Sequence, residues 1–211
     1  MNVLVMAKEP RPGLVKTRLC PPLTHAQACD VATAALADTL VAVARSGATT
    51  RVLALDGAPG PWLPAGFTVL PQSGRTFAER LARAWSHCSG PTLQIGMDTP
   101  QVSGPDLDEA LGDLELSGGR GVLGRCPDGG WWALGMDRPR PEVFDGVPMS
   151  TAVTGETQRR RMRQLGLDPR PLPEVVDVDT WTDAVTVAGL APHGSFGRTV
   201  RGLADDLREA S

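Results

Sequence analysis

The sequence lacks the excess of positive charge that a protein binding nucleic acid over its whole surface would carry. Its formal net charge is −3, and its sequence pI is near 5.6. This balance excludes a globally basic nucleic-acid binder, although it leaves room for a local basic patch. Hydrophobic residues make up 41% and charged residues 21% of the 211 positions, so disorder and coiled coil are also disfavoured. We therefore expect one globular domain without a nucleic-acid partner.

Long hydrophobic runs are also missing. A transmembrane helix needs roughly 20 apolar residues, and Asp38 interrupts the best stretch, residues 31–44. Residues 1–6 are apolar, but Lys8 and Glu9 follow at once, so this run is too short for the core of a signal peptide. The sequence predicts a cytoplasmic protein with no membrane partner.

Paired cysteines are absent as well, since the four cysteines form no Cys-x-x-Cys motif and the three histidines are equally dispersed. This spacing gives no support to a structural zinc site or a disulfide framework. The cysteines are interpreted as buried or incidental thiols: Cys20, Cys29, Cys88 and Cys126. A Gly-x-Ser-x-Gly motif is missing too, so a serine hydrolase triad has no starting point.

The chain does contain an alternation of strand and helix signals. Apolar runs predict strands at residues 1–6, 50–55, 67–70, 92–97, 121–124, 131–136 and 174–178. Capping residues and 3.6-residue periodicity predict helices at residues 24–46, 76–87, 105–116, 151–165, 180 onward and 198–209. This order predicts an α/β fold with a mostly parallel sheet over residues 1–191, followed by a C-terminal helical tail at 192–211.

A basic loop follows the first predicted strand. The chain has 19 arginines but only two lysines, and both lysines lie in this loop. Four positive charges, Lys8, Arg11, Lys16 and Arg18, fall within eleven residues, and Gly13 allows close backbone approach. Ligands of open α/β sheets bind beyond the carboxyl ends of strands. The loop is therefore a candidate phosphate-binding loop, the alternative being a solvated basic loop.

Two nucleotide-binding motifs are matched only in part, and neither has the sequence context that it needs. Residues 119–124 match G-x-G-x-x-G, but they follow a predicted helix and enter a strand, which is the reverse of the dinucleotide fingerprint. Lys16-Thr17 is similar to the end of a P-loop, but Val15 stands where that motif needs glycine. Neither motif supports a function.

Carboxylates follow two of the later predicted strands. Asp98 comes directly after the strand at 92–97, where it could hold Mg²⁺ or Mn²⁺, or simply cap the next turn. Asp177 and Asp179 alternate around Val178 at the end of the predicted strand at 174–178. Alternate strand residues share a face, so these two carboxylates would repel each other unless a cation lay between them. Asp179 could instead cap the following helix.

A glycine-rich turn separates the predicted strands at 121–124 and 131–136. Asp128-Gly129-Gly130 is a strong hairpin signal. Trp131 and Trp132 follow it and could belong to the core or form a platform for an acceptor.

Several of these segments, in this order, resemble one known family. Residues 6–19 (MAKEPRPGLVKTRL) are similar to the signature of the small MobA-like, glycosyltransferase-A-like transferases of the selenodomain-associated or arsenosugar-biosynthesis type. Residues 96–100 (GMDTP), 124–135 (GRCPDGGWWALG), 150–151 and 177–180 (DVDT) resemble its later blocks. The resemblance covers about residues 3–183, and a more distant similarity links the chain to CofC guanylyltransferases. It implies a Rossmann-like nucleotide-diphosphosugar transferase (GT-A) fold.

The resemblance also implies roles for individual residues. Lys16 and Arg18, assisted by Lys8, would neutralise donor phosphates, and Gln72 and Gly74 lie where related enzymes read the base. The metal, Mg²⁺ or Mn²⁺, would be held by Asp98, Asp177 and Asp179. Apart from the resemblance, we expect Asp128 to contact the acceptor or act as a base, beside Gly129, Gly130 and Trp131 on the acceptor side. The sequence departs from the family on that side, at Met149 and at residues 125–127.

The leading hypothesis is therefore a metal-dependent transferase, most simply a glycosyltransferase acting from a nucleotide sugar on a small-molecule acceptor. Two alternatives stay open. A nucleotidylyltransferase would use the same loop for a nucleoside triphosphate and release pyrophosphate. A non-catalytic nucleotide-binding module would keep the fold without turnover. Neither the oligomeric state nor the identity of base, sugar or acceptor follows from the sequence.

Overall fold

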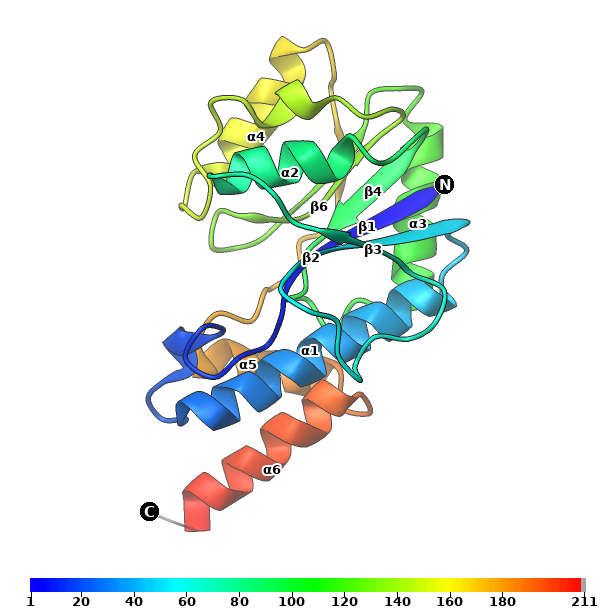
Figure 1. The fold of residues 1–211 in the computed structure, drawn as a ribbon. Coiled ribbons are helices and arrows are strands. Elements are labelled where there is room, and N and C mark those ends of the chain that lie inside the picture. Colours follow the sequence, from blue (N-terminus) through cyan, green and yellow to red (C-terminus); the bar gives the residue numbers. More distant parts are fainter. Residues whose placement is uncertain (210–211) are drawn as a thin grey trace.

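A seven-stranded sheet organises the chain, of which the computed structural model describes residues 1–209. Its order is β3-β2-β1-β4-β6-β5-β7. Figure 1 labels β1, β2, β3, β4 and β6 of this sheet. Only β6 runs antiparallel to its neighbours, so the mostly parallel sheet predicted from the sequence is confirmed. The strands are β1 (Asn2–Lys8), β2 (Thr50–Asp56), β3 (Thr68–Pro71), β4 (Thr92–Ile95), β5 (Val122–Arg125), β6 (Trp131–Met136) and β7 (Arg170–Leu172).

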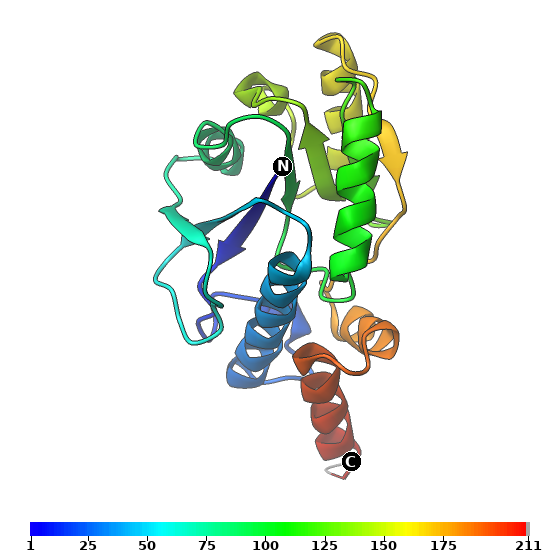
Figure 2. The same cartoon turned by 90° about the vertical axis from the view of Figure 1, so that its right-hand side faces the viewer.

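Helices cover both faces of the sheet because its central strands are apolar on both sides. In β1, Val3 and Val5 face the core beneath α1 (His25–Arg45) and α3 (Gly104–Leu116), which lie on one face in Figure 2. Leu4 and Met6 face the opposite core, beneath α2 (Phe77–Trp85), the short helix η2 (Pro141–Phe144) and α4 (Thr154–Gln164). Alternation along one strand thus fills both cores.

By length and composition alone, the 21-residue helix α1 is long and apolar enough to cross a membrane. This corrects the expectation that no stretch of the chain is. Most of the apolar stretch of α1 is buried inside the protein. Leu36 and Leu40 pack toward the sheet, whereas Ala28 and Val31 pack toward α5 (Trp181–Leu190) and α6 (Ser195–Glu209). Burial on two sides explains why this helix is so apolar.

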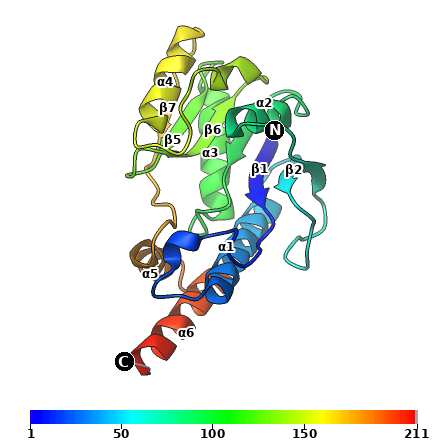
Figure 3. The ribbon, with the colours of Figure 1, turned by 60° about the vertical axis from the view of Figure 1, so that its left-hand side comes forward.

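The C-terminal helix α6 lies against α1 and α5 at one end of the molecule (Figure 3). Phe196 and Val200 are buried in this contact. The carboxylate of Asp38, the residue that interrupts the apolar run of α1, accepts hydrogen bonds from the backbone N–H groups of Ser195 at 3.0 Å and Phe196 at 2.8 Å. Asp38 therefore satisfies donors at the first turn of α6 that would otherwise lack partners.

The strand predicted at residues 174–178 is wrong. Strand β7 lies earlier, and residues 173–179 form an extended segment without strand pairing. Val175 N–H donates to Arg125 O at 3.2 Å, and Val178 N–H donates to Asp98 O at 3.0 Å. The segment, called the crossing segment below, thus crosses from the end of β5 to the residues after β4. Val178 is buried because of this crossing and not because it pairs with a neighbouring strand.

The turn predicted at 128–130 is present between β5 and β6, and it packs tightly on the residues that lead into α4. Helix α4 begins at Thr154, three residues later than predicted, because Thr151 and Thr154 instead hydrogen-bond to each other in a turn. Gly155 N–H donates to Gly129 O at 2.7 Å. Gly129 has φ +93°, and a Cβ added there would lie 1.9 Å from Ala152 O.

Replacement of Gly129 by alanine should therefore destabilise the protein by at least about 2 kcal/mol, since backbone strain and a backbone clash add together. Gly146→Ala is the matched control, because Gly146 also has positive φ (+72°) but a Cβ there meets nothing within 4 Å. Urea unfolding of both variants measures the difference. Equal losses at the two positions would show that the turn can move away from Ala152.

Candidate functional site

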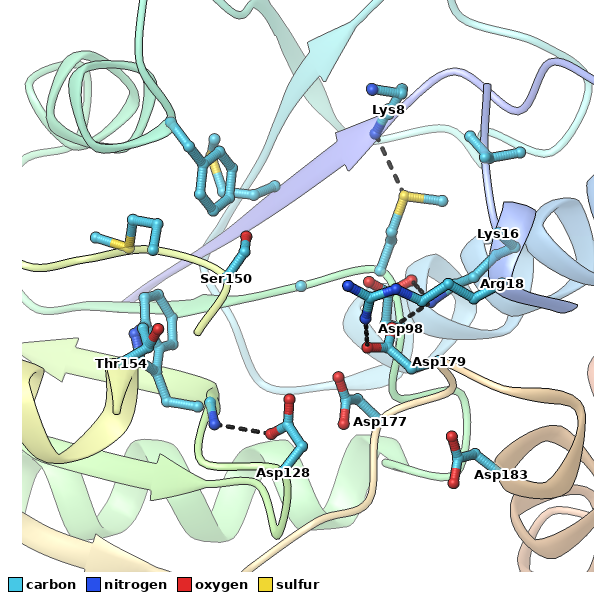
Figure 4. A pocket seen from close by; sticks show the side chains of 18 of the residues that line it. Lys8, Lys16, Arg18, Asp98, Asp128, Ser150, Thr154, Asp177, Asp179 and Asp183 are labelled. Atoms are coloured by element: carbon cyan, nitrogen blue, oxygen red, sulfur yellow. Dashed lines mark hydrogen bonds and ion pairs between the residues drawn. The ribbon is translucent and has the colours of Figure 1, made fainter. Parts of the chain in front are cut away.

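A cavity of about 970 Å³ lies beyond the carboxyl ends of β1 and β4. Figure 4 shows its charged groups converging from the basic loop after β1, from the β5–β6 turn and from the crossing segment. Nine of the predicted site residues line it: Lys8, Lys16, Arg18, Asp98, Asp128, Gly130, Trp131, Asp177 and Asp179. The other four, Gly13, Gln72, Gly74 and Gly129, lie in its supporting loops rather than among its lining residues.

Lys16 is held among carboxylates. Its Nζ lies 2.7 Å from Asp98 Oδ1 and 3.7 Å from Asp179 Oδ1, and it donates a hydrogen bond to the backbone carbonyl of Val178. Only 9% of its side chain is exposed. Arg18, which is 72% exposed, contacts the other oxygen of Asp179 at 2.8 Å. The predicted phosphate-binding cations and metal-binding carboxylates therefore compensate one another.

The backbone of the cavity is strained at two places. Lys16 (φ +48°) and Ser150 (φ +59°) are the two non-glycine residues with positive φ among residues 1–209, and both line the cavity. A left-handed conformation costs a side-chain-bearing residue roughly 1–2 kcal/mol. Strain of this kind concentrates at functional sites, so its location supports a functional role for the cavity.

Gln72 and Gly74, which were predicted to read the base, support the backbone at the edge of the site. The Gln72 amide donates to Ala7 O at 2.8 Å and to Ala54 O at 2.9 Å, which ties β3 to the ends of β1 and β2. Gly74 has φ +137°, and a Cβ there would lie 2.9 Å from Glu79 Cβ at the start of α2. The donor group of the Gln72 side chain is thus already used by the protein.

The remaining loop residues are also engaged. Arg11 pairs with Glu9 at 2.6 Å, and this contact raises the pKa of Arg11 and lowers that of Glu9. Gly13, with φ +76°, lies at the turn of the loop. A Cβ added there would lie 4.0 Å from His25 Cγ. Of the four loop cations, Lys8, Lys16 and Arg18 reach the cavity, and Arg11 is turned to Glu9.

Three carboxylates crowd the middle of the site. The crossing segment places Asp177 between Asp128 and Asp179 (Figure 4). Burial, with the nearby charges of Asp128 and Asp179, raises the pKa of Asp177 to about 6. Asp128 Oδ1 accepts a hydrogen bond from Gly130 N–H at 2.7 Å, which leaves its second oxygen toward the cavity. Asp183, which also lines the cavity, caps α5 through Thr180.

Cys126 is the site residue that sequence reasoning missed. Its Sγ and one oxygen each of Asp128 and Asp177 lie within 4.8 Å of one another. The thiol is buried, and burial, followed by the charges of the neighbouring aspartates, raises its pKa. Its position two residues before Asp128, inside the turn, was the available signal.

The other half of the cavity is less charged. Ser150, Thr151 and Thr154 contribute hydroxyl groups, and apolar side chains line it with them. Thr154 Oγ1 is already bonded to Pro148 O at 2.8 Å. Met6, Phe77, Trp131 and Met149 contribute apolar side chains, whereas the apolar Leu14 and Met97 belong to the charged segments around Lys16 and Asp98. This half has room for an uncharged part of a ligand.

Solved structures of other proteins share the fold. A candidate nucleotide-diphospho-sugar transferase from Desulfovibrio desulfuricans G20 is 24% identical, with a TM-score of 0.86 over 99% of this chain and 96% of that one. The 2-C-methyl-D-erythritol 4-phosphate cytidylyltransferase from Thermus thermophilus is 18% identical, with a TM-score of 0.55 over 91% and 100% of the two chains. For a CMP:2-keto-3-deoxy-manno-octonic acid synthetase complexed with CTP, the values are 11% and 0.52 over 90% and 98%.

These likenesses confirm the nucleotide-diphospho-sugar transferase fold expected from the sequence. No curated protein matches the sequence. Residues 27–151, which make up more than half of the chain, match the DUF2064 family, described as an uncharacterized protein conserved in bacteria, and the chain therefore belongs to this family.

Proposed function

We propose that this protein is a cytoplasmic transferase that uses a nucleotide-activated donor, and that it transfers a glycosyl group from a nucleotide sugar to a small-molecule acceptor, as MobA-like glycosyltransferases do. The observation that carries the proposal is the position of Lys16. A strained, nearly buried ammonium among carboxylates, at the carboxyl ends of β1 and β4, is suited to a phosphate-bearing ligand.

Donor binding would exchange the partners of Lys16. Its charge is compensated by Asp98 and Asp179 in the structure. A diphosphate entering the cavity would attract Lys16 and the exposed Arg18, which together would stabilise the negative charge that grows on the leaving phosphate oxygen. Lys8 would assist from the end of β1.

The carboxylates fit a divalent cation. Asp98, Asp177 and Asp179 would hold Mg²⁺ or Mn²⁺, which would supply charge neutralisation for the diphosphate. The fit is supported by the crowding that raises the pKa of Asp177 to about 6, since a cation there would relieve the repulsion.

Asp128 would act on the acceptor. Gly130 N–H fixes one of its oxygens, and the residue lines the cavity. As a general base it would take the proton of an acceptor hydroxyl while the acceptor oxygen bonds to the sugar carbon and the bond from that carbon to the phosphate oxygen breaks. Gly129, Gly130 and Trp131 complete this side, and the apolar half of the cavity would receive the rest of the acceptor.

A thermal-shift panel tests this function. We expect one nucleotide sugar, with Mg²⁺ or Mn²⁺, to raise the melting temperature more than the matching nucleoside triphosphate does. A ligand at 100 times its Kd adds about 2.7 kcal/mol of stability. For a chain of this size that is a rise of roughly 5–10 °C. EDTA should remove the metal-dependent part.

The same panel separates the alternatives. A preference for one nucleoside triphosphate, with pyrophosphate released in its presence, would favour nucleotidyl transfer. Stabilisation by a nucleotide without any product would favour a nucleotide-binding module that lacks turnover. No shift with any nucleotide would overturn the proposal.

A further inference from the structure

We propose that Cys126, Asp128 and Asp177 form a mixed sulfur and oxygen site that prefers a thiophilic divalent cation, such as Zn²⁺ or Co²⁺, to Mg²⁺. One ligand atom from each residue lies within 4.8 Å of the other two. Ligands of one zinc ion, at about 2.0–2.3 Å from it, are at most about 4.6 Å apart. Small side-chain movements would therefore bring all three atoms to one ion.

The charges of the site favour this position for a cation. Asp98 and Asp179 are already paired with two cations, the ammonium of Lys16 and the guanidinium of Arg18. Asp128 and Asp177, in contrast, have no ion-pair partner within the described residues 1–209. The uncompensated negative charge of the cavity therefore lies beside Cys126.

The thiol gives the site its chemical class. Cys126 is 3% exposed, and its Sγ has no hydrogen-bond partner in the part of the chain that the structure describes. Asp128 and Asp177 line the cavity, so an ion would enter past the carboxylates and meet the sulfur behind them. Mg²⁺ demands oxygen ligands in octahedral geometry, whereas thiolate selects softer metals. As the metal–sulfur bond forms, the thiol proton leaves to the solvent.

Backbone hydrogen bonds fix the segments that carry the three ligands. Cys126 N–H donates to Gly130 O at 3.1 Å, and Gly129 N–H donates to Cys126 O at 3.1 Å, which closes the turn that carries Cys126 and Asp128. The crossing segment, bonded at Arg125 and Asp98, carries Asp177 to the same place. Three protein ligands would leave a coordination position open to a substrate oxygen. The inference rests on the proposed function in one respect, since it names the metal class for Asp177. With this ion bound, Asp128 is a ligand of the metal instead of the general base.

Titration of the protein with CoCl₂ tests the site directly. We expect a sulfur-to-cobalt charge-transfer band in the near ultraviolet that saturates at one ion per chain. The band should be absent in Cys126→Ala and retained in Cys88→Ala, which removes another buried thiol, one that is not grouped with Asp128 and Asp177. Loss of a hydrogen bond to a metal ligand alone costs about 10–100-fold in affinity. Cys126→Ala should therefore weaken Co²⁺ and Zn²⁺ binding at least that much while leaving Mg²⁺ binding nearly unchanged.

Three results would overturn the inference: no charge-transfer band in the unmodified protein, the same band in Cys126→Ala, or equal losses of Mg²⁺ and Zn²⁺ affinity in that variant. Circular dichroism checks that Cys126→Ala is folded, and Asp128→Asn provides a second variant that should weaken Co²⁺ binding. The proposed function fails separately. If nucleotides stabilise the protein with Mg²⁺ but cobalt gives no band, only the thiophilic site is wrong. If the band appears but no nucleotide binds, the transferase proposal is wrong.

Discussion

Replacing Lys16 with alanine should reduce transfer by about 100–1,000-fold, the loss expected when one preorganised group that stabilises developing charge is removed. Lys16 is 9% exposed and faces both Asp98 and Asp179, so its place cannot be taken by a mobile surface cation. Turnover is measured with the donor that gives the largest thermal shift. Lys16→Arg should not restore activity, because a planar guanidinium does not fit the position of a compact ammonium.

Arg18→Ala is the matched control for Lys16. Arg18 contacts the same Asp179 but is 72% exposed, so its removal should cost less than about tenfold in turnover. Lys16→Ala should also lower the unfolding free energy by about 1 kcal/mol, since Asp98 loses its partner while 39% of its side chain remains exposed. Full activity in Lys16→Ala would contradict the proposed phosphate-binding role, and unfolding of the variant would indicate a structural one.

Asp177→Asn should make the metal-free protein more stable at pH 8 and remove its stabilisation by divalent metal. The pKa of Asp177 is about 6 in the folded protein and 3.8 in its ordinary state. Between these values the folded state binds more protons than the unfolded state, so stability falls as pH rises and stays lower above pH 6. The shift of about two units corresponds to at most about 3 kcal/mol. Partial exposure reduces this to about 1–2 kcal/mol.

The unfolding free energy of Asp177→Asn, measured in EDTA at pH 4.5 and pH 8, checks this sign. The gain over the unmodified protein should be large at pH 8 and small at pH 4.5. Asp205→Asn, on the exposed surface of α6, should show no such difference. With Mn²⁺ or Zn²⁺ added, the unmodified protein should gain stability and Asp177→Asn should not. A variant less stable than its parent at pH 8 without metal would show that the carboxylates do not repel each other there.

Local signals were sufficient to predict most of the fold. The capping box that begins at Thr24 starts α1 as expected, because its hydrogen bonds involve neighbouring residues only. The prediction of a strand at 174–178 was wrong, because apolar residues indicate that a segment is buried but not which element it packs against. The hydrogen bonds of Asp38 could not be predicted either, since its partners in α6 lie 157 and 158 residues away.

The candidate site was predictable where its residues follow strand ends. Lys16 and Asp98 come after β1 and β4, which are neighbouring parallel strands. The carboxyl ends of such strands lie at the same edge of the sheet. Their direct ion pair could not be predicted, because it depends on the left-handed backbone at Lys16. The proximity of Cys126 to Asp177 was equally hidden, because it depends on a segment that joins two strands without pairing as a strand.

The core beneath α6 has a consequence for how the site opens. Leu19 of the basic loop, Val178 of the crossing segment and Phe196 of α6 share one buried cluster. Lys16 and Asp177 are thus attached, through near neighbours, to the same apolar unit as the C-terminal helix. Local unfolding follows such units rather than single loops. Fraying of α6 and loosening of both charged walls of the cavity would therefore be one cooperative event, which couples the end of the chain to the order of its binding loop.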